Sequence, residues 1–134
     1  MEIVVDHLGD VQFEVKARNH TVICDQPEEN GGFDEGMTPP EFMLASLGSC
    51  AAYYAAQYLK ARQLATQGLR VRVTAGKGKA PARLVDFKIE VQLPRFLEER
   101  HKEGVLRAVH SCLIHNTLLH PPQITTVLVQ PLAA

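Results

Sequence analysis

The chain has 134 residues, of which 46% are hydrophobic and 22% charged, and its formal net charge is −1. This balance is typical of a globular protein and argues against a disordered chain. No basic cluster is present, so we expect no nucleic-acid partner, because phosphate binding needs clustered lysine and arginine.

The N-terminus, Met1–Asp6, is acidic and strand-like and lacks the charged start and long apolar run of a signal peptide. Three cysteines do not suit a secreted disulfide scaffold, which needs an even and larger number. The most apolar stretch, Phe42–Ala56, is interrupted by serine and glycine and falls short of the ~20 residues that a bilayer requires. We therefore expect a cytoplasmic protein with reduced thiols, no membrane partner and a single domain over residues 1–134.

Three short strands are predicted first. Apolar and polar residues alternate from Val11 to Arg18, and further apolar runs cover Ile3–Leu8 and Thr21–Cys24. Period-two alternation with tight turns between the runs indicates an antiparallel meander. Residues 26–37 are rich in glycine and acidic side chains and are predicted to form a loop.

A long helix is predicted to follow. Thr38 can cap it, Pro39 suits its first position, and Glu41 completes a capping box. Nothing but Gly48 breaks the pattern before residues 63–64, and the first two-thirds are apolar on every face. Such a helix must be covered on all sides, so we expect it at the centre of the fold or at a subunit interface.

The second half predicts a hairpin, helices and a last strand. Alternating segments at residues 69–74 and 85–93 flank a turn placed at residues 76–82. From residue 96 the pattern is helical, with Val105, Val109, Cys112 and Leu113 on one stripe, and residues 116–120 suggest a further short helix. Residues 124–129 read as a strand, which gives the order βββ-α-ββ-α(α)-β and an α+β fold.

Two cysteine motifs carry a resemblance to a known family. The segment Thr38–Cys50 reads TPPEFMLASLGSC, a T-x-P-E-type helix start whose glutamate, Glu41, lies nine residues before the cysteine. The segment Cys112–Asn116 reads CLIHN. Together they resemble the OsmC/Ohr family (osmotically inducible and organic hydroperoxide resistance proteins), and the spacing is nearer to its less-studied OsmC-like branch.

The resemblance implies an OsmC-like fold with a long buried central helix, an intertwined homodimer, and a thiol peroxidase that reduces organic hydroperoxides. Cys50 would match the peroxidatic cysteine and Cys112 the resolving one, closing a disulfide that a dithiol reductant reopens. Glu41 would match a carboxylate that orients an active-site arginine. The resemblance implies no cofactor and no metal.

Two positions depart from the family pattern. Leu113 stands where the second motif usually has proline, and no arginine aligns plainly with the active-site arginine. Arg18 is the best candidate, and an ordinary exposed arginine at a strand end is the alternative. The cation matters because the pKa of a cysteine is ordinarily ~8.5 and apolar surroundings raise it, so little thiolate forms unaided.

Helix geometry separates Glu41 from Cys50. Nine steps of 100° place them on opposite faces, with ~13.5 Å of rise between them. They cannot serve one site within one helix, so Glu41 would have to come from a second chain.

Other interpretations stay open. Either motif cysteine alone is more often a core residue than a reactive one, and Cys24 is interpreted as structural. His110, His115 and His120 flank Cys112, so a Cys/His metal site is one alternative. A non-catalytic small-molecule binder that keeps the fold is another.

Overall fold

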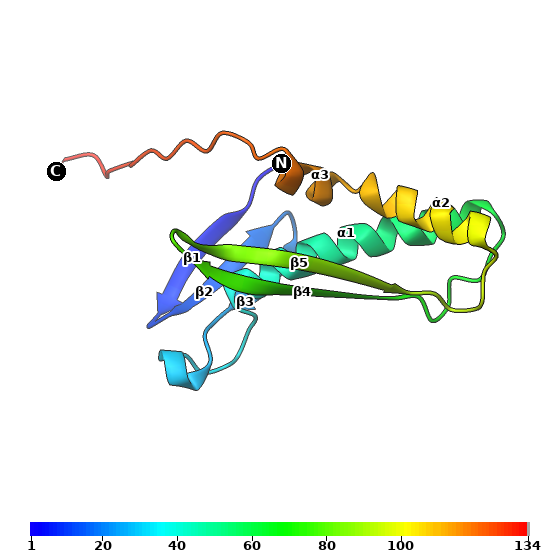
Figure 1. Ribbon diagram of the computed structural model, residues 1–134. Coiled ribbons are helices and arrows are strands. Elements are labelled where there is room, and N and C mark those ends of the chain that lie inside the picture. Colours follow the sequence, from blue (N-terminus) through cyan, green and yellow to red (C-terminus); the bar gives the residue numbers. More distant parts are fainter. Residues whose placement is uncertain (134) are drawn as a thin grey trace.

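The N-terminal part is a three-stranded antiparallel sheet (Figure 1), seen in a computed structural model that describes residues 1–133. Strands β1 (Val4–Gly9), β2 (Gln12–Ala17) and β3 (His20–Cys24) follow one another as a meander, as the alternation predicted. Val15 of β2 lies opposite Val5 on one side and Val22 on the other.

The loop after β3 is folded around one buried carboxylate. Asp25 is fully buried and accepts hydrogen bonds from the backbone N–H groups of Gln26, Phe33 and Glu35 and from the Gln12 amide. The loop includes a short 3-10 helix, η1 (Glu28–Asn30). These bonds tie the loop to β2 and fix the approach of the chain to the next helix.

Helix α1 (Pro39–Ala61) begins at the expected capping box, with Thr38 as the N-cap. Its buried residues recur every four positions and form one stripe: Leu47, Ala51, Ala55 and Leu59. This stripe packs against β4 and β5 and against α2 and α3. The opposite face is open, and Tyr53 is exposed there.

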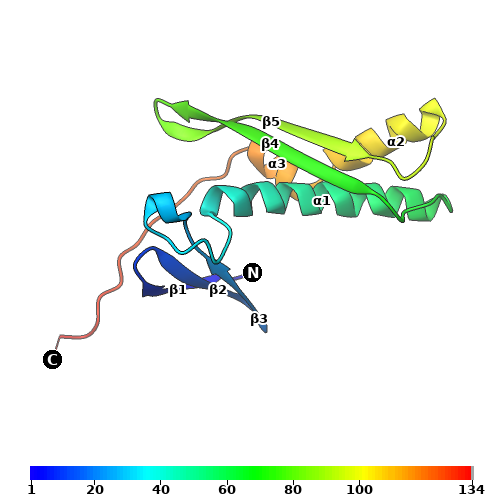
Figure 2. The same cartoon turned by 90° about the horizontal axis from the view of Figure 1, so that it is seen from below.

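The remaining elements cover one side of α1. Strands β4 (Arg70–Lys79) and β5 (Ala82–Gln92) form a long antiparallel hairpin. Helix α2 (Glu99–His110) packs along α1, and the short helix α3 (Leu113–Leu119) follows it (Figure 2). None of the helices among residues 1–133 is long and apolar enough to cross a membrane.

Three expectations need correction. The turn of the hairpin is Ala80-Pro81 alone, because the predicted turn residues continue the strands past an irregularity between Thr74 and Gly76. Cys112 and Leu113 do not extend the stripe of α2, since the chain bends after His110 and Cys112 caps α3.

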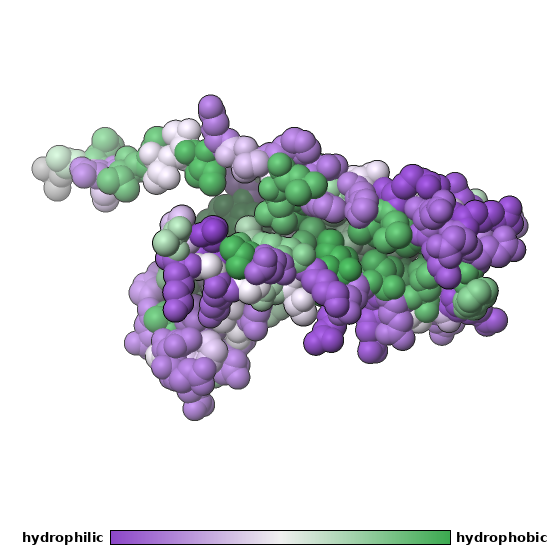
Figure 3. All heavy atoms as spheres, viewed as in Figure 1, coloured by the Kyte–Doolittle hydropathy of each residue, from purple (hydrophilic) through white to green (hydrophobic). Residues whose placement is uncertain are grey.

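The third correction concerns the last strand. Residues 124–129 form no strand within this chain, because no neighbouring strand offers them hydrogen bonds. The tail runs away from the body (Figure 1), and its apolar side chains are largely exposed, among them Ile124, Leu128 and Val129. Figure 3 shows apolar residues along this tail and across the middle of the molecule, with hydrophilic residues gathered at the end where α2 begins.

Candidate active site

The two motif cysteines come together from different elements. Cys50 lies in the middle of α1 and is partly exposed, whereas Cys112 is fully buried at the junction of α2 and α3. Both are free thiols, and the Cys50 sulfur is near enough to Cys112 to raise the pKa of its thiol. The packing of α2 and α3 on α1 therefore brings together two residues that are 62 positions apart in the sequence.

Two opposing influences act on Cys112. Burial and the neighbouring Cys50 sulfur raise the pKa of the Cys112 thiol, because both disfavour its charged form. The backbone N–H groups of His115 and Ile114 at the start of α3 lower the pKa of the same thiol, and the net direction is upward. Cys112 is thus a protonated thiol at neutral pH.

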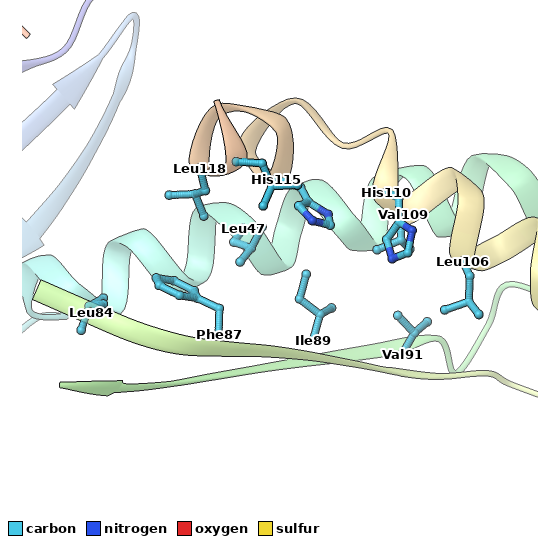
Figure 4. Close-up of a pocket in the computed structure, with 11 residues that line it drawn as sticks. Leu47, Leu84, Phe87, Ile89, Val91, Leu106, Val109, His110, His115 and Leu118 are labelled. Atoms are coloured by element: carbon cyan, nitrogen blue, oxygen red, sulfur yellow. The ribbon is translucent and has the colours of Figure 1, made fainter. Parts of the chain in front are cut away.

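An apolar cavity of about 530 Å³ is lined by residues that neighbour both cysteines in the sequence, although neither cysteine lines it. It opens between β5 on one side and α1, α2 and α3 on the other (Figure 4). Leu47, one turn before Cys50, and Val109, three residues before Cys112, both line it. Its other walls are Leu84, Phe87, Ile89, Val91, Leu106, Leu118 and Leu119, with the two histidines His110 and His115.

The histidine pair supplies the polar part of the cavity wall. The rings of His110 and His115 meet edge to face, with 5.4 Å between centroids, across the bend that holds Cys112. In Figure 4 the His115 side chain reaches from α3 toward the end of α2. Its Nδ1 atom is buried and has no hydrogen-bond partner among the described residues.

Glu41 stays at the start of α1. Its carboxylate accepts hydrogen bonds from the backbone N–H and the hydroxyl of Thr38, at 2.7 and 2.9 Å. These bonds hold the pKa of Glu41 below its ordinary value. Glu41 thus caps α1 in its own chain, and the helix places it on the face opposite Cys50.

Arg18 also lies away from the thiol pair in its own chain. It forms the exposed tip of the β2–β3 turn with Asn19, since Ala17 pairs with His20. Its φ of 53° is in the left-handed region, which few side chains adopt without a local reason. The sheet that carries it packs mainly on itself and hardly touches α1.

The metal alternative has little support within residues 1–133. No group of three histidine, cysteine or acidic side chains there is arranged to hold a metal ion.

Cys24 is buried at the end of β3 beside Asp25, and burial together with the Asp25 charge raises the pKa of its thiol.

The apolar cavity and the residues that line it were not predicted from the sequence. The signal was present, because Phe87, Ile89 and Val91 alternate along β5 and must share one face. What the sequence did not reveal is that α2 and α3 stand back from this face and leave space beside the thiols.

The fold is that of an OsmC-type α+β protein. It has a long central helix, a β hairpin packed against that helix, and one thiol on α1 (Cys50) and one at the start of α3 (Cys112). The family model described as OsmC-like protein matches residues 32–127. The chain therefore belongs to the OsmC-like protein family, and the matched segment contains both motif cysteines.

Solved structures share this fold at low sequence identity. An osmotic stress induced and detoxification response protein of Psychrobacter arcticus is 20% identical with a TM-score of 0.79, over 86% of this chain and 85% of its own. An OsmC-like protein of Mycoplasma pneumoniae is 20% identical with a TM-score of 0.74, over 90% and 87%.

A third structure bears a more specific description. An organic hydroperoxide resistance protein of Elizabethkingia anophelis is 19% identical with a TM-score of 0.64, over 87% of both chains. No curated protein shows significant sequence similarity to the chain.

Proposed function

We propose that this protein is a thiol-dependent reductase of organic hydroperoxides, with Cys50 as the peroxidatic and Cys112 as the resolving cysteine. One observation carries the proposal: α2 and α3 pack on α1 so that the Cys50 sulfur is near enough to raise the pKa of the Cys112 thiol, with Cys50 partly exposed and Cys112 buried. A structural neighbour described as an organic hydroperoxide resistance protein adds support at the level of the family.

The reaction would run in three steps. The Cys50 thiolate attacks the distal oxygen of the hydroperoxide, the O–O bond breaks, and an alcohol leaves with a proton while Cys50 becomes a sulfenic acid. The Cys112 thiol then condenses with it to a disulfide and releases water. A dithiol reductant restores both thiols by exchange.

The surroundings of Cys50 favour an alkyl hydroperoxide over hydrogen peroxide. The cavity that Leu47 and Val109 line is apolar apart from the histidine pair, and its volume of about 530 Å³ is in the range of small-molecule sites. An alkyl group there gains burial of its apolar surface, which hydrogen peroxide cannot do.

We also propose that the protein works as a homodimer. The chain exposes 10652 Å² at a mass of 14.8 kDa. A folded monomer of that mass is expected to expose only about 7,000 Å². The open face of α1, the sheet β1–β3 and the apolar tail account for much of the excess, and a second copy would cover them.

The test is hydroperoxide consumption by the purified protein with an alkyl hydroperoxide and a dithiol. Cys50→Ser should abolish consumption, whereas Cys112→Ser should complete one turnover and stall at the sulfenic acid. Cys24→Ser is the matched control and should retain activity, because Cys24 lies beside Asp25 and outside the thiol pair. Wild-type activity in Cys50→Ser would end the proposal.

A second candidate is a small-molecule binder without catalysis, which the apolar cavity also favours. A wild-type protein that consumes no peroxide yet binds an apolar probe in this cavity would support it.

A further inference from the structure

The disulfide between Cys50 and Cys112 is a premise of this inference, which therefore rests on the proposed function. Burial makes Cys112 poorly suited to form that disulfide unaided. Only a thiolate attacks another sulfur effectively. Burial raises the pKa of this thiol, so at neutral pH its proton must be removed as the reaction proceeds. A nearby base would accelerate that step.

His115 is placed to act on this proton. It lies three residues after Cys112, at the third position of the helix that Cys112 caps, and its backbone N–H is near enough to lower the pKa of the Cys112 thiol. A side chain at the third position of a helix can reach back toward the residue that caps it. The edge contact with His110, which is two residues before Cys112, keeps the ring over the same bend.

The His115 ring also has an atom without a structural task. Its Nδ1 is the buried side-chain nitrogen that lacks a hydrogen-bond partner in the described part of the chain. Leaving a buried polar atom unpaired costs free energy, and such atoms in folded proteins call for an explanation, which is often chemical. The Nδ1 atom is therefore not committed to any other side chain of the described residues.

We propose that the His115 imidazole is the acid–base group of disulfide formation between Cys112 and the oxidised Cys50. The neutral ring takes the proton from the Cys112 thiol, and the thiolate attacks the Cys50 sulfur. The S–O bond of the sulfenic acid breaks, and its electron pair leaves with the hydroxyl oxygen. The protonated ring returns its proton to that oxygen, so the products are a disulfide, one water molecule and a neutral imidazole.

The groups around the ring are few. His110 on α2 meets it edge-on, Cys112 caps the helix that carries it, and the β5 residues that line the same cavity are apolar. Arg107 of α2 is directed to Glu103, 3.8 Å away on the surface. His110 is therefore the one competing base among these neighbours, and the test must separate the two histidines.

The test follows the second step by itself. Reduced protein is mixed with one equivalent of an alkyl hydroperoxide, quenched with acid, and analysed by mass spectrometry for sulfenic acid and disulfide. In His115→Gln the sulfenic acid should form at the wild-type rate, while the disulfide should form on the order of 10²-fold more slowly at neutral pH. Circular dichroism checks that this variant is folded.

The pH profile distinguishes a proton-transfer role from a structural one. Imidazoles ordinarily change protonation between about pH 5 and 8, so the wild-type rate of disulfide formation should rise through that range. His115→Gln should lose this rise and accelerate only in more alkaline solution. His110→Gln should keep it, and so should His120→Gln, whose Nδ1 already pairs with the Asn116 carbonyl oxygen at 3.1 Å.

Chemical rescue adds a further readout. His115→Ala opens space at a cavity of about 530 Å³, into which free imidazole can diffuse. Added imidazole should restore much of the rate of disulfide formation in His115→Ala and leave His115→Gln unchanged. A wild-type profile in both His115 variants, or a profile that changes only in His110→Gln, would overturn the inference.

A second arm keeps this inference separate from the proposed function. Glutathione disulfide replaces the peroxide, so that closure of the Cys50–Cys112 disulfide releases a glutathione thiol instead of water. Closure that depends on His115, in a protein that consumes no peroxide, would contradict the proposed function and support the role of His115. Closure independent of His115 under both oxidants would overturn that role.

Discussion

The hydroxyl of Tyr58 on α1 occupies the space that a side chain at position 104 of α2 would need. Gly104 is fully buried, and the same hydroxyl lies 3.3 Å from Nδ1 of His101. The guanidinium of Arg62 stacks on the Tyr58 ring, 3.8 Å from its centroid. The two helices therefore meet at a point where only glycine fits.

Gly104→Ala should consequently destabilise the protein. Glycine to alanine inside a helix ordinarily stabilises by about 0.5–1 kcal/mol, so the expected loss of about 1–3 kcal/mol from overpacking reverses the usual sign. Chemical denaturation measures the change. Gly48→Ala in α1 is the comparison, because its methyl would meet only a Val73 methyl at 3.1 Å and should cost less. A stabilised Gly104→Ala would contradict the packing described above.

Asp25→Asn tests the loop that leads into α1. Burial alone would raise the pKa of Asp25, but the N–H groups of Gln26, Glu35 and Phe33 and the Gln12 amide hold it below its ordinary value. Because the folded-state pKa is depressed, this stabilisation is full above the unfolded value of about 3.9 and is lost as the pH falls through the folded one.

Asp25→Asn should melt at a lower temperature at pH 7. The NH₂ group of the asparagine would replace one carboxylate oxygen and would face N–H donors of the loop, which it cannot accept. The stability of this variant should also change less than that of the wild type between neutral and acidic pH. Thermal unfolding at several pH values measures both effects. Asp34→Asn, on the exposed side of the same loop, is the control, and equal behaviour of the two variants would refute this account.

The long helix and the meander could be predicted because local signals fix them. Thr38 and Glu41 mark the start of α1, and alternation marks β2. The hairpin turn was misplaced because Gly76 and Gly78 suggested a turn, whereas they lie within β4. Glycine in a strand often marks a bulge or a close approach of another group, and one sequence does not distinguish these from a turn.

The site was only partly accessible to sequence reasoning. Cys50 and Cys112 stand in motifs whose family resemblance implies that they work as a pair, but the sequence alone does not show that they approach each other. The position of the His115 ring depends on the bend between α2 and α3, which no periodicity reveals. Residues 124–129 read as a strand but need a partner strand, and that partner is not among residues 1–133.

Sedimentation should show a stable dimer at micromolar concentration. Tyr53 is 59% exposed on the open face of α1, so Tyr53→Glu would place a charge in the expected interface and should weaken the dimer. Arg100→Gln, at the hydrophilic start of α2, is the control and should leave the dimer intact. A wild-type protein that sediments as a monomer would remove the dimer from the proposal.

The activation of Cys50 leads to the last prediction. Arg18 lies at the exposed tip of the β2–β3 turn, on a sheet that hardly touches α1 in the same chain. If this arginine serves Cys50, it must therefore do so from the partner chain of a dimer. A cation within ~4–6 Å shifts the titration of an ionisable group by roughly 1–3 pH units, so its removal should be measurable.

Arg18→Gly is the informative substitution, because glycine accepts the φ of 53° and the turn should fold without the guanidinium. The pH at which Cys50 becomes half-maximally reactive toward an alkylating agent should rise by roughly 1–3 units in Arg18→Gly and much less in Arg18→Lys. Glu41→Ala should give a smaller shift in the same direction, if this carboxylate orients the arginine.

The decisive experiment mixes chains: an Arg18→Gly chain paired with a Cys50→Ser chain contains one site with both native residues. Recovery of activity in this mixed dimer, with neither parent active, would establish that Arg18 acts across the interface. An unchanged alkylation profile in Arg18→Gly would assign the activation of Cys50 to another residue, with Arg62, Arg70 and Arg72 next to be tested.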